Sequence, residues 1–387
     1  MSNAQRIVIT GIGAVSPYGH SIEALCARRQ PRDFVAGSGK ALPLGSGATL
    51  YAIDQLDSTG FVHPRLKRKL DPFTVHGLCA AGMALDSSRL FKQDIDKGDV
   101  GVFVGNCLGG WGYTEPQLQA LHQVGVKEMG PYVATAWFPA ALQGQISLAY
   151  GIKGYSKTFS ARNVAGIQAI GHGVAAIRAG RAKVALCGAS EAVNTPYMQA
   201  VLDRYPGEQT TADETVFGRE KLTDLAEGAA FLVVEDYEHA LARGATVYCE
   251  VTGFADHFCP SRLSAPKVMH ASLEEALGTQ GGERLLLLDG LLARERELTH
   301  AAITKLEASA HLEAVDTKPV YGHMFALSGV LETALAANYL SQNKLSARSF
   351  DPQHIPGDTV YAGAIVQRLS PQGGVATLGL SQLPANA

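Results

Sequence analysis

The sequence predicts an α/β fold in which helices cover both faces of an apolar sheet. Short apolar runs recur along the chain, and each ends at glycine or another small residue, as strands do before a turn. Between them lie helical segments such as VAGIQAIGHGVAAIRAG, residues 164–180, with small residues at helical spacing. Strands that are apolar on both faces belong to sheets covered by helices on both sides. The runs span residues 6–17, 99–110, 181–192, 229–244, 246–254 and 283–292.

Three segments place elements along the chain. Residues 6–17 carry alternating β-branched residues and stop at glycines, which predicts a strand and a tight turn. Residues 155–169 predict a strand, a sharp turn and a helix, with Ser160 at the turn, a geometry that often presents a nucleophile. Residues 321–340 predict a glycine turn and a long amphipathic helix, with His323 where the turn enters the helix.

Composition excludes several classes of protein. The 387 residues have a formal net charge of -3, which gives no reason to expect nucleic acid or an anionic membrane as a partner. No run reaches about 18 apolar residues, and the amino terminus lacks the pattern of a signal peptide, so we expect a cytoplasmic protein without a membrane span. The six cysteines form no CxxC pair and the twelve histidines no HxxxH pair, so we expect no metal and no disulfides.

Two familiar motifs are incomplete. Gly11 and Gly13 resemble the start of a dinucleotide fingerprint, but Ser16 stands where the third glycine belongs and Pro17 would interrupt the helix. Ser160 lacks the flanking glycines of a hydrolase nucleophile elbow. Neither nucleotide binding nor esterase activity is therefore favoured.

Four blocks, in the same order along the chain, resemble the β-ketoacyl synthase family of the elongating type. The resemblance implies a thiolase-like, five-layered αβαβα fold made of two duplicated halves, at residues 1–245 and 246–387, that works as a dimer without a cofactor. The blocks are VITGIGAVSPYG (8–19), YGIKGYSKTFSARNVAGIQAIGHGVAAIRAGRAKVALCGASEA (150–192), LTDLAEGAAFLVVEDYEHALARGATVYCEVTGF (222–254) and TKPVYGHMFALSGVLETALAA (317–337).

The resemblance also implies that the condensing site is degenerate. Ser160 stands where active members carry the nucleophilic cysteine, and Asp289 stands where they carry the first histidine. The second histidine, His323, and the accompanying Lys318 are kept. Leu380 occupies the position of the gating phenylalanine, and we expect the last strand to be truncated or missing. Three altered parts predict a subunit that no longer condenses.

Within the family, the chain is most similar to the chain length factor of bacterial type II polyketide systems. The resemblance implies a heterodimer with an active ketosynthase, acting on a chain carried by an acyl carrier protein. Trp111, Thr114 and Leu118 match the positions that line the tunnel for that chain. The sequences of residues 137–145 and 156–161 resemble those of chain length factors from aryl polyene clusters.

Aromatic residues follow that tunnel segment. Tyr132, Trp137 and Phe138 lie in the region that reaches towards the neighbouring subunit in the family's dimers. Such a concentration of aromatic residues also suits an ordinary buried interface. Pocket lining and plain packing therefore remain alternatives.

Two other functions remain open. Ser160, His323 and Asp289 suggest an altered site for acyl transfer, hydrolysis or malonyl decarboxylation. The chain alternatively forms a non-catalytic homodimer that binds acyl groups. Against a catalytic Ser160 stands a simpler interpretation, in which a small residue is needed at a crowded turn and caps the following helix.

Overall fold

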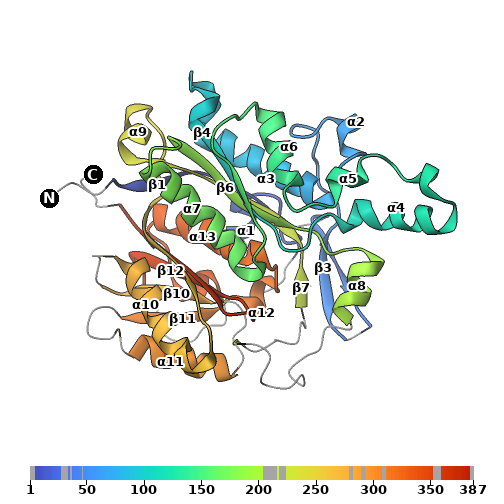
Figure 1. The fold of residues 1–387 in the computed structure, drawn as a ribbon. Coiled ribbons are helices and arrows are strands. Elements are labelled where there is room, and N and C mark those ends of the chain that lie inside the picture. The colour runs from blue at the N-terminus through green and yellow to red at the C-terminus, as the bar shows by residue number, and fades with distance from the viewer. Residues whose placement is uncertain are drawn as a thin grey trace.

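A single twisted sheet with helices on both faces forms the frame of the molecule (Figure 1). The computed structural model describes residues 5–27, 34, 37–45, 47–203, 216–217, 224–278, 282–288, 293–304, 306, 311–351 and 359–383. The ten strands follow the order β11-β10-β12-β13-β9-β1-β8-β6-β4-β5. A separate small sheet has the order β2-β3-β7. Its strands are β2 (Gly39–Pro43), β3 (Thr49–Ile53) and β7 (Asp224–Ala226).

The large sheet is built from two copies of one five-strand pattern. Numbered within its own half, each set runs in the order third, second, fourth, fifth, first. In both halves the second strand pairs parallel with the third and the fourth, and the fifth pairs antiparallel with the fourth and the first. The prediction of two duplicated halves is therefore confirmed. The division between residues 245 and 246 stays a prediction.

The strands of the two halves have these bounds. The first half contains β1 (Ile7–Val15), β4 (Val100–Gly105), β5 (Lys157–Phe159), β6 (Val184–Glu191) and β8 (Gly228–Asp236). The second half contains β9 (Cys249–Phe258), β10 (Arg284–Leu288), β11 (Leu312–Asp316), β12 (Gly363–Leu369) and β13 (Gly374–Ser381). The halves join where β1 pairs antiparallel with β9.

The helices form an outer layer on each half and one shared layer between them. α3 (Pro72–Ser88) packs on β1 and β8, and α10 (Ala265–Leu277) packs on β9 and β13. α7 (Ala165–Arg178) and α13 (Ala326–Ser341) contact each other and strands of both halves. This arrangement confirms the thiolase-like layering. The remaining helices are α1 (Ile22–Cys26), α2 (Pro64–Lys67), α4 (Trp111–Gln123), α5 (Val133–Ala136), α6 (Ala141–Tyr150), α8 (Pro196–Asp203), α9 (Tyr237–Ala242), α11 (Ala293–Thr304) and α12 (Lys318–Tyr321).

Glycine lets the two central helices meet. A Cβ added at Gly166 in α7 would lie 2.0 Å from the carbonyl oxygen of Ala326, at the start of α13. A Cβ at Gly329 would lie 2.7 Å from the side chain of Ile167. Because neither contact has room for a side chain, α7 and α13 begin close together, with the Ser160 turn ahead of one and His323 ahead of the other.

The expectation that the last strand is truncated or missing is wrong. β13 pairs with β12 from Val375 to Ser381 and also with β9, so it lies inside the sheet. Leu380 is 0% exposed within this strand, not in a turn. The glycine turn of this hairpin comes earlier, at residues 370–374, where Gly373 has a φ of 105°. The prediction was wrong because it placed the glycine turn at the end of the chain, whereas the turn precedes the last strand.

Candidate functional site

Ser160 follows β5 and stands ahead of α7, so the predicted strand, turn and helix are all present. Ser160 is exposed to solvent. The residue at the helix N-cap is Val164, and no side chain caps it, so the interpretation of Ser160 as a helix cap is wrong. The sharp part of the turn is at Arg162, which has a φ of 55°. The backbone there takes a conformation that residues other than glycine rarely adopt.

His323 is buried and held by its backbone. Its N–H donates to the carbonyl of Asp224 at 2.8 Å, and its carbonyl accepts from the N–H of Ala226 at 3.0 Å, which ties it to β7. The imidazole packs edge-on against Phe325, with 4.6 Å between ring centroids. Lys318 begins α12 and is also buried. These contacts fix His323 as part of the fold ahead of α13.

The described residues do not assemble a catalytic triad. Asp289 lies outside the described residues. Ser160 is exposed whereas His323 is buried, and within the described part of the chain Ser160 has no hydrogen bond to His323.

Sequence reasoning missed two features next to the Ser160 turn, the side chain of Asn163 and the glycine turn at Gly373 and Gly374. The side-chain amide of Asn163 donates to the carbonyl of Leu369, at the end of β12, at 3.3 Å. The carbonyl of Gly373 accepts from the N–H of Cys259 at 2.7 Å, and Gly374 packs beside Val164. The glycine turn of the last hairpin therefore lies next to the turn that carries Ser160. The Gly-Gly pair between two apolar runs was the signal in the sequence.

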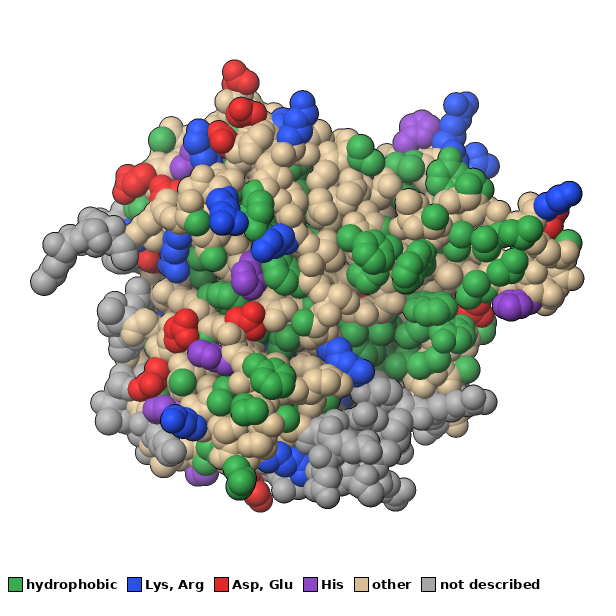
Figure 2. Space-filling view, in the orientation of Figure 1, with side chains coloured by type: hydrophobic (Ala, Val, Ile, Leu, Met, Phe, Trp, Pro, Cys, Tyr) green, Lys and Arg blue, Asp and Glu red, His purple; other side chains and the backbone are tan. Residues whose placement is uncertain are grey.

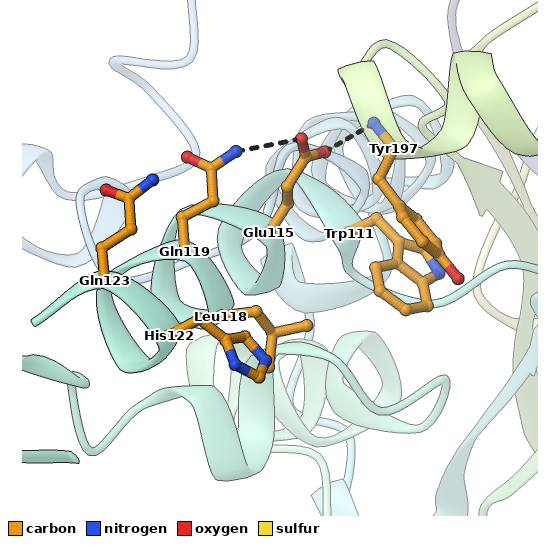
Figure 3. A pocket seen from close by; sticks show the side chains of 7 residues that line it. All are labelled: Trp111, Glu115, Leu118, Gln119, His122, Gln123 and Tyr197. Atoms are coloured by element: carbon orange, nitrogen blue, oxygen red, sulfur yellow. Dashed lines mark hydrogen bonds between the residues drawn. The ribbon is translucent and has the colours of Figure 1, made fainter. Parts of the chain in front are cut away.

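A groove of about 400 Å³ runs along α4 and faces α8 (Figure 3). Trp111 stacks on Tyr197 with 4.4 Å between ring centroids, and Leu118 extends the apolar lining. We call this cavity the α4 groove. Four more side chains line it and are polar: Glu115, Gln119, His122 and Gln123. The groove is partly open to the surface.

The predicted tunnel residues fall into two groups. Trp111 and Leu118 line the α4 groove. Thr114 is buried and is not part of that lining, and its hydroxyl donates to the carbonyl of Gly110 at 2.6 Å. The structure thus separates Thr114 from its two neighbours along the helix.

The three aromatic residues beyond α4 are exposed. Trp137 and Phe138 each keep 51% of their surface accessible, and Tyr132 keeps 42%. Figure 2 shows hydrophobic side chains gathered on this side of the molecule, over α4, α5 and α8. The described part of this chain does not bury these rings, and pocket lining and packing at an interface both remain alternatives for them.

Buried carboxylates hold the start of α4. Glu191 accepts from the backbone N–H of Cys107 at 2.6 Å and of Leu108 at 3.2 Å. Asp71 caps α3 and accepts from the N–H of Tyr113 at 2.7 Å, in the first turn of α4. Burial raises the pKa of Glu191 to about 8 and that of Asp71 to about 6. These residues join the groove to the core of the first half.

Raising the pH from 6.5 to 8 is expected to lower the free energy of unfolding by about 1–2 kcal/mol. The raised pKa of Glu191 means that folded Glu191 binds a proton that the unfolded chain has already released, so stability falls as pH rises. His76 acts in the opposite direction, since burial lowers its pKa to about 3, but most of its contribution is made below pH 6.5 and only about 0.4 kcal/mol remains between pH 6.5 and 8. Urea unfolding at both pH values checks this. A Glu274→Gln variant, at an exposed position, should show the same decrease in the free energy of unfolding between pH 6.5 and 8. A free energy of unfolding that stays constant or rises over this range would contradict the assignment.

Within the described residues, no helix is both long and apolar enough to cross a bilayer. Nor do three or more His, Cys, Asp or Glu side chains come together there as metal ligands. None of the six cysteines forms a disulfide.

Comparison with known proteins identifies similar chains. The family model "Beta-ketoacyl synthase, N-terminal domain" matches residues 4–240. A putative polyketide beta-ketoacyl synthase 2 from Streptomyces halstedii is 30% identical, over 87% of this chain and 85% of its own. A chain in a solved complex of a type II polyketide acyl-carrier protein with its ketosynthase bound to the hexaketide is 37% identical, with a TM-score of 0.83, over 98% and 100% of the two chains. The ishigamide ketosynthase/chain length factor has the same fold, at 23% identity and a TM-score of 0.79, over 98% and 100%.

Proposed function

The chain belongs to the β-ketoacyl synthase family, and we propose that within it this protein is a non-condensing chain length factor. It pairs with an active ketosynthase, and the α4 groove forms part of the tunnel that receives the growing acyl chain. The acyl carrier protein delivers that chain to the partner. The length of the product depends on how far the tunnel extends into this subunit.

The observation that carries the proposal is the open α4 groove beside exposed aromatic residues. Trp111, Leu118 and Tyr197 supply an apolar lining for a carbon chain, yet the groove is partly open to solvent. Trp137 and Phe138 lie exposed beyond it. A partner that covers these rings would also close the groove, and apolar burial would favour the complex.

The chemistry of the described thiols and hydroxyls supports a subunit that does not condense. A condensing nucleophile needs a thiolate, whereas burial raises the pKa of the thiols of Cys79, Cys107, Cys187 and Cys249. Ser160 is exposed, and no described side chain forms a hydrogen bond with its hydroxyl. The partner must therefore supply the nucleophile.

Co-expression with a complete ketosynthase from the same genome tests the proposal. Native mass spectrometry should find a one-to-one complex, and malonyl-dependent elongation should require both chains. Ser160→Ala should leave the elongation rate unchanged, because the serine has no chemical role. Replacing the partner's nucleophilic cysteine with alanine is the control that should abolish elongation.

The opposite result would support the alternative sites. A stable homodimer that turns over acyl thioesters alone, and loses that activity with Ser160→Ala, would identify Ser160 as a nucleophile. A homodimer that binds acyl groups without turnover would identify a non-catalytic binding protein. Either result would overturn the chain length factor proposal.

The proposal extends to the product. The sequences of residues 137–145 and 156–161 resemble those of factors from aryl polyene clusters, which favours an aryl polyene. A conjugated polyene absorbs visible light, whereas an unreduced poly-keto chain does not. Mass and absorption spectra of the chain released from the carrier protein by mild base distinguish the two products.

A further inference from the structure

The two walls of the α4 groove belong to helices that are far apart in the sequence. α4 supplies Trp111 and Leu118, and α8 supplies Tyr197. α8 is short, and of its side chains Met198 and Leu202 are buried. Because so little of α8 is buried, the width of the groove depends on what holds the start of α8 against α4.

Glu115 links the two helices. Its Oε2 accepts from the backbone N–H of Tyr197 at 3.0 Å, and Figure 3 shows its carboxylate turned towards the start of α8. Among the residues that the structure describes, this is the one hydrogen bond that joins α4 to α8. Glu115 lies one helical turn after Trp111 and is 9% exposed, although it lines the groove. It is therefore a fixed contact between the walls and not a solvated surface charge.

The start of α8 offers a backbone donor that needs an acceptor. Pro196 opens the helix and has no N–H, and the N–H of Met198 donates to the hydroxyl of Thr195 at 3.1 Å. The N–H of Tyr197 lies between them, and first-turn donors have no partner inside their own helix. A carboxylate is a strong acceptor for such a donor and is favoured near the positive end of a helix. Glu115 therefore holds α8 by its backbone.

We propose that Glu115 is the positioning residue that sets the width of the α4 groove. It holds the first turn of α8 against α4, and so keeps Tyr197 stacked on Trp111 with 4.4 Å between ring centroids. This inference rests on the proposed function, in which the groove receives the acyl chain. It adds the residue that determines how much space the two walls leave for that chain.

Two substitutions of similar size separate the hydrogen bond from the space that the side chain fills. Glu115→Met keeps an unbranched side chain in the lining but has no strong acceptor for the N–H of Tyr197. Glu115→Gln keeps an amide oxygen that accepts from the same N–H. Breaking a hydrogen bond to a charged group shifts a local equilibrium by about tenfold or more, so α8 detaches from α4 more often in Glu115→Met.

The emission of Trp111 tests this inference in the purified chain, without any partner. The chain has two tryptophans, so Trp137→Phe leaves Trp111 as the one indole. In that background we expect Glu115→Met to shift the emission to longer wavelength and to raise the acrylamide quenching constant severalfold, because the Tyr197 ring leaves the indole face. Glu115→Gln should match the background. Glu128→Met, at an exposed carboxylate beyond α4, is the matched control and should also match it.

Equal emission and quenching in Glu115→Met and its background would overturn the inference. A change in Glu115→Gln as large as that in Glu115→Met would also overturn it, because the amide keeps the acceptor. Glu115→Asp replaces Glu115→Met if the methionine variant does not fold. It shortens the reach of the carboxylate by one methylene, so we expect a smaller shift in the same direction, and no shift would again overturn the inference.

The product of the complex with the ketosynthase, with Trp137 kept, separates this inference from the proposed function. Glu115→Met should raise the ratio of longer to shorter products by roughly threefold to tenfold, and Glu115→Gln should leave it unchanged. A ratio that responds to Trp111→Ala and not to Glu115→Met would overturn the inference and leave the proposed function intact. Ratios unchanged in both variants, with the emission shift as expected, would overturn the proposed place of the tunnel and leave the contact between α4 and α8 as described.

Discussion

Replacing Trp111 with alanine is expected to lengthen the acyl chain that the complex of this subunit with its ketosynthase produces. The indole stacks on Tyr197 at 4.4 Å and occupies one end of the α4 groove, so its removal extends the space available to a chain. A pocket that excludes one methylene discriminates by about 1–3 kcal/mol, so we expect the ratio of longer to shorter products to rise by roughly tenfold or more. Mass spectrometry of the chains released from the carrier protein measures that ratio.

Two neighbours on the same helix provide matched controls. Leu118→Ala should shift the products in the same direction but less, because it removes a smaller side chain from the lining. Thr114→Ser should leave the distribution unchanged, since Thr114 does not line the groove and serine keeps the hydrogen bond to the carbonyl of Gly110. A longer product from Thr114→Ser, with none from Trp111→Ala, would mean that the tunnel runs elsewhere.

The sequence predicted the fold because several ordered blocks, each with a strand ending in glycine, repeat one pattern. The places of individual residues within the fold were harder to predict. Leu380 was assigned to a gate, but it lies in a strand whose mixture of small and apolar residues gives little sign of burial on both faces. The turn next to the Ser160 segment contains Gly373, whose carbonyl accepts from the N–H of Cys259, the residue after β9. Contacts between distant segments determine such positions, and no local pattern reports them.

The groove was predicted only in part, for a related reason. Trp111 and Leu118 were identified on α4, but Tyr197 comes from α8, which joins the groove through tertiary packing. Glu115 explains that packing, because its carboxylate accepts from the N–H of Tyr197 at 3.0 Å. A carboxylate in the middle of an amphipathic helix is usually solvated, so nothing in the sequence distinguishes this one.

The largest expected loss of stability comes from a buried ion pair that joins α13 to β12. Glu332 and Arg368 form this pair, with 3% and 1% of their side-chain surfaces exposed. The hydroxyl of Thr317 donates to Glu332, and the guanidinium of Arg368 donates to the carbonyl of Gln367 at 2.7 Å. Thr317 is the residue before Lys318, so the pair also anchors the segment that leads to His323.

Glu332→Leu is expected to lower the free energy of unfolding by about 3–5 kcal/mol, because it leaves the Arg368 charge buried without its partner. The double variant Glu332→Leu, Arg368→Leu should recover most of that loss, since no charge then remains inside. Asp54→Asn breaks the exposed pair of Asp54 with Lys40, and should cost less than about 1 kcal/mol. Urea unfolding followed by circular dichroism compares the three. If the two pairs prove equally costly to break, or if the double variant is no more stable than Glu332→Leu, then the buried charge does not determine the stability of this half. The expected order instead makes the Glu332–Arg368 pair the link between the core of the second half and the segment that places His323.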